Sequence, residues 1–169
     1  MRIALIAAAA SALALSGCAS MALPGGDMTR EDRAGYTAMA GASDLFEIQS
    51  SQVALSRSQN AQVRQFAQML ITHHTQTTAA LTTAAAASGM TPPAPMLMPM
   101  QQRMMQELQG APAGSFDRVY LRQQVPAHEM ALALHQNYAA RGDATPLRGA
   151  AAAAVPIVQQ HLAQARQMD

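Results

Sequence analysis

The chain contains no lysine and only one cysteine, Cys18, among its 169 residues. A single cysteine cannot form a disulfide within the chain, and it cannot build a metal site from several thiolates. Aromatic residues make up only 4% of the sequence, and no cluster of basic residues is present. Nucleic-acid binding therefore has no support, because it depends on a basic surface and often on stacking aromatic side chains.

The sequence motifs of several enzyme classes are also absent. The chain has no nucleophile elbow, no glycine-rich hydrolase loop and no phosphate-binding loop. Runs of β-branched residues are absent as well, whereas alanine, glutamine, leucine and methionine dominate, and this composition favours helix. We therefore expect an all-α protein, and the sequence leans towards a non-enzymatic role without deciding it.

The N-terminal segment predicts export. Arg2 precedes an apolar run over residues 3–15, which has the length of a secretory signal and is too short to span a bilayer. The sequence Leu15-Ser16-Gly17-Cys18 follows, and it resembles the lipobox of bacterial lipoproteins. The alternative is an ordinary cleaved signal with an incidental cysteine.

The lipobox resemblance implies a signal peptide over residues 1–17, a lipidated Cys18 and a short tether over residues 18–27. Two or three acyl chains, at about 0.8 kcal/mol per buried methylene, would hold the protein on a membrane and leave it no free thiol. Ala19 favours sorting to the outer membrane with the domain facing the periplasm. The inner membrane and the cell surface stay open as alternatives.

Apolar residues at spacings of three and four predict four long amphipathic helices. Their alanine-rich faces predict a close-packed antiparallel four-helix bundle that forms one domain over residues 28–169. A short extra helix is expected in the long connection between the second and third long helices. The long helices are expected at about residues 29–57, 60–88, 115–140 and 145–169, and the short one at about 96–109.

Single residues refine these boundaries. Thr29, Ser115 and Thr145 are expected to cap the first, third and fourth long helices. Pro126 and Pro156 fall inside the last two helices and predict kinks. The equal alternative for Pro156 is that it begins a separate, short final helix.

Each long helix places an ionisable residue on or beside its apolar stripe, and these residues are Glu47, His74, His128 and His161. An unpartnered buried polar group costs about 1–3 kcal/mol, so we expect these side chains to find partners. A carboxylate and three imidazoles suit one ion of zinc, iron, manganese or copper(II). The alternative is that they bond to each other, to backbone or to water without any metal.

A methionine-rich stretch offers a second candidate site. Met96, Met98 and Met100 are closely spaced, and Met104 and Met105 follow. Thioether sulfur is a soft ligand that suits copper(I). The alternative is that these adaptable apolar side chains pack the short helix against the bundle.

The chain resembles a known family in three stretches that occur in order. It is similar to the bacterial exported proteins of domain-of-unknown-function family 4142 over about residues 30–166. The resemblance implies a ferritin-like fold and very little about function, since the biochemistry of that family is not established. Members typically have an aspartate where this chain has His73. The stretches are FAQMLITHHTQT (residues 66–77), FDRVYLRQQVPAHEMAL (residues 116–132) and VPIVQQHLAQA (residues 155–165), within which His74, Asp117, Tyr120, His128, Pro156 and His161 match.

A dinuclear iron centre of the ferritin type is not expected. Such centres use Glu-x-x-His motifs, and here Ile71, Val125 and Val158 stand three residues before the histidines. A metal site in this bundle would therefore be mononuclear and rich in histidine.

Three functions remain open. The sequence slightly favours a non-enzymatic envelope lipoprotein whose exposed bundle face binds a protein partner. The second is a bundle that holds one transition-metal ion in its core, and the third is copper(I) handling by the methionine stretch. The sequence identifies neither the partner nor the metal.

Overall fold

The computed structural model describes residues 32–169, and the predicted all-α class is confirmed, since this part of the chain contains helices and no strand. The predicted signal, the tether with Cys18, and Thr29 lie outside the described residues. Among residues 32–169, no helix is both long and apolar enough to cross a bilayer. The helices are α1 (Arg33–Arg57), α2 (Ala61–Ala87), α3 (Pro99–Gly110), the short 3₁₀ helix η1 (Ala113–Ser115), α4 (Phe116–Arg141) and α5 (Thr145–Met168).

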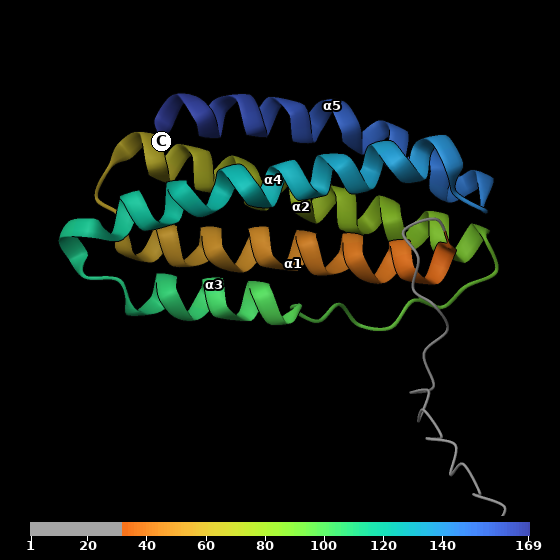
Figure 1. The fold of residues 1–169 in the computed structure, drawn as a ribbon, viewed down its shortest axis with the longest axis horizontal. Coiled ribbons are helices and arrows are strands. Elements are labelled where there is room, and N and C mark those ends of the chain that lie inside the picture. The colour runs from red at the N-terminus through yellow and green to blue at the C-terminus, as the bar shows by residue number, and fades with distance from the viewer. Residues whose placement is uncertain (1–31) are drawn as a thin grey trace, which may run out of the picture.

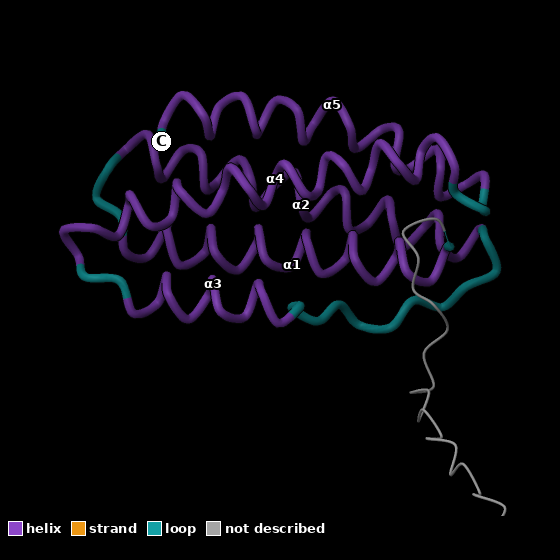
Figure 2. The backbone as a smooth tube through the Cα atoms, in the orientation of Figure 1, coloured by secondary structure: helices purple, strands orange, loops and turns teal. Residues whose placement is uncertain are grey.

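The four long helices form an antiparallel bundle (Figure 1). Helix α1 packs against α2 and α4, and α5 packs against α4 and α2, with each of these neighbours running in the opposite direction. The extended linker after α2 returns along the outside of the bundle and leads into α3, which continues in the same direction (Figure 2). The connection from α2 to α4 therefore spans the length of the bundle, and the predicted short extra helix lies within it.

Several predicted helix starts were wrong by one to four residues. Helix α1 begins at Arg33, because the Asp32 carboxylate caps it by accepting a hydrogen bond from the Gly35 N–H at 2.7 Å. Helix α5 begins at Thr145 with Ala144 at its N-cap, so Thr145 is the first helical residue instead of the cap. Ser115 does occupy the N-cap position of α4, but its hydroxyl donates to the Pro112 carbonyl and caps nothing.

Both internal prolines lie within continuous helices. Pro126 is inside α4 and Pro156 is inside α5, so Pro156 does not begin a separate helix. Gly89 ends α2 in the left-handed region with φ of 73°, a conformation that glycine adopts without a steric penalty.

The core is divided into apolar ends and a polar centre. One end is a cluster that includes Val63, Phe66 and Leu70, and the other includes Leu81 and Leu147. Between them lies a layer of buried polar side chains from all four long helices, which we call the central layer. Its members are Asp44, Glu47, Ser50, Ser51, His74, Gln124, His128 and His161.

Helix α3 packs on the outer side of α1 and α4 through Met105 and Leu108. Its C-terminal end is held by Arg57, whose guanidinium donates hydrogen bonds to the carbonyls of Leu108 at 3.1 Å and Gln109 at 2.8 Å. This end of a helix leaves carbonyl groups without intrahelical partners, and Arg57 satisfies two of them.

Candidate metal centre

Three histidines from three helices meet in the central layer. His74 comes from α2, His128 from α4 and His161 from α5, and all three are at most 1% exposed. One ring nitrogen from each lies within 4.8 Å of the other two. Within residues 32–169, this is the group of histidine, cysteine and acidic side chains whose geometry could hold a metal ion. We call it the histidine triad.

The ring of His74 is fixed by a carboxylate. Its Nδ1 lies 2.8 Å from Asp44 Oδ1, and a carboxylate oxygen can only accept, so Nδ1 carries the proton and donates it. The other oxygen of Asp44 accepts hydrogen bonds from the hydroxyls of Thr77 and Thr78, each at 3.0 Å. With Nδ1 protonated, a neutral His74 presents a bare lone pair at Nε2.

The ring of His128 is fixed by a backbone carbonyl one turn earlier on the same helix. Its Nδ1 donates to the carbonyl oxygen of Gln124 at 2.8 Å. The Nε2 atom of a neutral His128 therefore carries a lone pair, and it has no hydrogen-bond partner.

His161 is paired with a fourth histidine. Its Nε2 lies 2.8 Å from Nδ1 of the half-buried His73, and the two rings are stacked at 5.1 Å with an angle of 13° between their planes. When His161 Nε2 donates to His73, the unpartnered Nδ1 of His161 is the third bare lone pair. In each of the three histidines, one ring nitrogen is thus bonded and the other is buried without a hydrogen-bond partner.

Two imidazoles of the triad, those of His128 and His161, resist protonation. Burial, reinforced by the neighbouring His74, lowers the pKa of His128 to about 3 and that of His161 to about 2. Both rings are therefore neutral at pH 7, which is the form that binds metals.

Glu47 lies beside the triad without joining it. Its Oε1 is 3.6 Å from His128 Nδ1, the nitrogen that is already bonded to Gln124, and not from the unpartnered Nε2. Neither carboxyl oxygen has a hydrogen-bond partner. Burial, together with the charge of Asp44, raises the pKa of Glu47 well above its usual range. The structure thus groups three of the four residues that the sequence suggested as ligands, with the fourth adjacent.

The triad needs only a small adjustment to hold an ion. Bonds of about 2.0–2.1 Å in a tetrahedral site place the ligand nitrogens about 3.3 Å apart. The longest separation here is 4.8 Å, so each ring has to move inward by less than about 1 Å. Three protein ligands leave one coordination position open, as in catalytic zinc sites.

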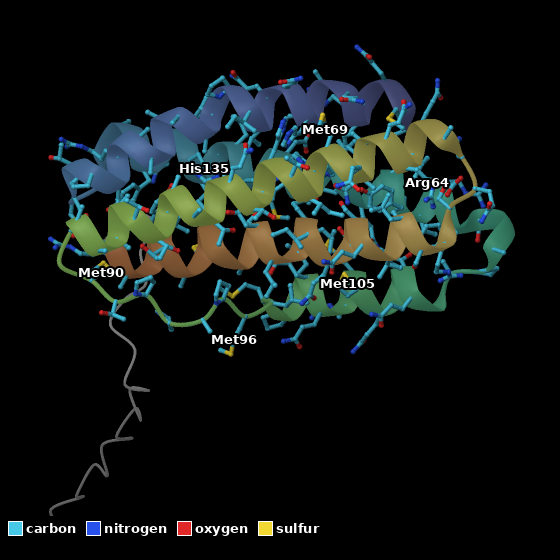
Figure 3. The ribbon with its side chains drawn as sticks, turned by 180° about the vertical axis from the view of Figure 1, so that it is seen from behind. Arg64, Met69, Met90, Met96, Met105 and His135 are labelled. Atoms are coloured by element: carbon cyan, nitrogen blue, oxygen red, sulfur yellow. The ribbon has the colours of Figure 1, made fainter. Side chains whose placement is uncertain are left out.

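The methionines suggested by the sequence are split between two places. Met98 and Met100 line a cavity between α1, α3 and α4. Met96 does not line that cavity, since its side chain is 78% exposed and points away from the bundle (Figure 3).

The sequence showed the ligand histidines but missed most of the residues that orient them. Asp44 precedes Glu47 by one helical turn on α1, and Thr78 follows His74 by one turn on α2. That spacing puts each pair on one helix face and was the available signal. His73 was visible as the neighbour of His74, but a sequence cannot show that it would stack on His161 from another helix.

The comparisons with known proteins agree with the fold. The model of the family described as "Domain of unknown function (DUF4142)" matches residues 19–168. A solved structure described as "CopM in the Cu(II)-bound form" superposes with a TM-score of 0.68 and 18% sequence identity, covering 80% of this chain and 94% of that chain. At this level of identity the likeness shows a shared helical-bundle fold. No curated protein matches the chain.

Proposed function

We propose that this chain, which belongs to the DUF4142 family, binds one divalent transition-metal ion through His74, His128 and His161. The observation that supports this most strongly is that ring nitrogens of the three histidines lie within 4.8 Å of one another and that each ring has one buried nitrogen without a hydrogen-bond partner. A water molecule has two protons and would leave one of three lone pairs unsatisfied, whereas a cation satisfies all three. This geometry favours metal binding over the partner-binding role that the sequence alone slightly favoured.

Copper(II) is the first ion to test. Imidazole ligands suit copper, zinc, nickel and iron, and among divalent ions of the first row copper(II) binds a given nitrogen site most tightly. The similar fold of a protein described in a Cu(II)-bound form supports the same choice. Two carboxyl groups, those of Asp44 and Glu47, lie beside the triad. Their combined charge would balance a divalent ion in the dry core once the ion displaces the proton that burial favours on Glu47.

The test measures metal stoichiometry and affinity in matched variants. Protein stripped with chelator is titrated with copper(II) and zinc(II) by calorimetry, and the bound metal is then quantified by elemental analysis. His128→Gln removes one ligand from the triad. His135→Gln is the control, because His135 is also a buried histidine of α4 but bonds to Tyr36 at 3.0 Å and is not part of the triad.

We expect one ion per wild-type chain and per His135→Gln chain. The His128→Gln variant should lose more affinity than the roughly 10- to 100-fold that follows removal of a ligand's hydrogen-bond partner. Equal binding by all three proteins, or no stoichiometric metal in the wild type, would rule out the histidine triad as the site.

We also propose that the mature protein is attached by lipid at Cys18 to the outer membrane and faces the periplasm. The lipobox sequence in residues 15–18 supports this. In a bacterial host, the wild type should label with a fatty-acid probe and sediment with membranes. Cys18→Ala should abolish both, and unlabelled wild-type protein would contradict the proposal.

A further inference from the structure

The cavity between α1, α3 and α4, which Met98 and Met100 line, is rich in sulfur. It has a volume of about 120 Å³ and lies where α3 packs against α1 and α4. Five methionines line it, together with Ser43, Phe46, Gln101, Ala127, Ala131 and Leu134. The methionines are Met39 from α1, Met98, Met100 and Met104 in and just before α3, and Met130 from α4. We call this the methionine pocket.

The clustering of methionine here is strong. Residues 32–169 contain ten methionines, and half of them line this one pocket. Two of them, Met100 and Met130, leave 42% and 43% of their surface exposed. A methionine that only fills the core stabilises the fold because its side chain is removed from water. Packing therefore does not explain why these two side chains stay this exposed.

The chemistry of the lining is selective. It contains no carboxylate, no imidazole and no basic side chain, so magnesium, calcium and other hard ions would find no suitable ligands there. Thioether sulfur is soft and neutral, and it prefers soft monovalent ions with a filled d shell, of which copper(I) is the biological example.

The placement of the side chains allows several sulfurs to reach one ion. Met100 and Met104 lie one turn apart on the same face of α3, and Met130 faces them from α4. Methionine is unbranched with three rotatable side-chain bonds, so sulfurs that line one small cavity can turn inward without moving the helices.

We propose that the methionine pocket binds copper(I). This site is separate from the histidine triad, shares only helix α4 with it, uses different ligand chemistry, and does not depend on whether the triad binds metal. Because thioethers do not titrate between pH 5 and 8, its affinity is independent of pH over that range.

The test replaces sulfur while keeping shape and hydrophobicity. Copper(I) is titrated under anaerobic conditions in competition with a chromogenic copper(I) chelator, at pH 5.5 and at pH 7.5. The variant is Met100→Leu/Met104→Leu/Met130→Leu. The matched control is Met69→Leu/Met90→Leu/Met168→Leu, which removes three sulfurs elsewhere in the described chain. A third protein, His128→Gln, reports on the triad.

We expect the wild type, the control triple variant and His128→Gln to compete for copper(I) equally and at both pH values. The pocket triple variant should bind at least about tenfold more weakly. X-ray absorption of the loaded wild type should show sulfur neighbours. The proposal is overturned if the leucine variant of the pocket binds as well as wild type, or if binding is lost in His128→Gln. If the triple variant fails to fold, it is replaced by the single substitution Met130→Leu. Met130 is 43% exposed, so this substitution disturbs the core little.

Discussion

Two polar regions of this bundle differ in whether they contain buried polar atoms without a hydrogen-bond partner. Near one end, Tyr36 bonds to His135 at 3.0 Å, and Tyr138 donates to Asp143 at 2.9 Å. Among the described residues, the buried polar atoms that lack a hydrogen-bond partner include none from Tyr36, Tyr138 or His135. In the central layer, Glu47 and the three triad histidines all have buried atoms without one.

The hydrogen bonds of His135 and of the triad histidines indicate different roles for these buried side chains. His135 is also buried, at 5% exposed against at most 1% for the triad members, and its hydrogen bond to Tyr36 makes it part of the packing. The triad histidines have one satisfied nitrogen each, and the satisfied nitrogen serves to orient the unsatisfied one. A hydrogen-bond partner on one edge of an imidazole and a bare lone pair on the other is the usual arrangement of metal-binding histidines.

The substitution that should lower stability most is in an apolar end of the core and leaves the central layer intact. Phe66→Ala in the end cluster should lower the free energy of unfolding by about 3–5 kcal/mol, because it removes a fully buried ring. Metal affinity of the folded variant should stay unchanged. Urea denaturation and calorimetric titration measure the two quantities, and a parallel loss of both would show that the two regions are not independent.

The next effect is stabilisation by metal. At a free-ion concentration of 100 times Kd, binding should raise the free energy of unfolding by about 2.7 kcal/mol. Thermal unfolding with copper(II) or zinc(II), and again after addition of EDTA, measures this gain. His161→Gln should abolish it and His135→Gln should keep it. If both variants gain as much as wild type, the ion binds outside the triad.

Paired substitutions in the two regions should act with opposite sign on the metal-free protein. Glu47→Met removes a buried carboxyl whose oxygens have no partner, and should stabilise by about 1–3 kcal/mol. His135→Leu leaves the buried Tyr36 hydroxyl without its partner and should destabilise by about the same amount. If the denaturation midpoints of the two variants shift in the same direction, the two regions do not differ in the way described.

Counted per pH unit, the smallest effect is on the pH dependence of stability. Burial lowers the pKa of His135 from 6.5 to about 4, with the charge of Asp44 opposing the shift. The unfolded chain therefore binds a proton at this site that the folded chain refuses, and the contribution of His135 is lost as pH falls from 6.5 towards 4. Metal-free wild type should lose about 1.4 kcal/mol more per pH unit than His135→Gln in this range. Parallel stability curves of the two proteins would contradict this.

Much of the fold follows from the sequence because it rests on periodicity. The 3.6-residue repeat of apolar side chains, Gly89 and the long connection were enough to predict four long helices, and they left open whether the connection crosses the end of the bundle or its length. The helix starts were less predictable, because Asp32 and Thr29 are both good N-cap residues and the sequence does not distinguish them.

The site was predictable in composition but not in geometry. A histidine on an apolar stripe, as at positions 74, 128 and 161, shows that imidazoles enter the core. Which edge of each ring is bonded depends on Asp44, Gln124 and His73, and two of these contacts join different helices. The methionine pocket was hidden for the same reason, because Met39 and Met130 lie far from the methionine stretch in the chain.

The most direct measurement is anomalous diffraction at the copper absorption edge from crystals of the copper(II)-loaded protein. We expect one strong peak in the central layer, about 2.0–2.1 Å from one nitrogen each of His74, His128 and His161. Crystals that show copper only on the protein surface, with the three rings still facing an unoccupied centre, would contradict it.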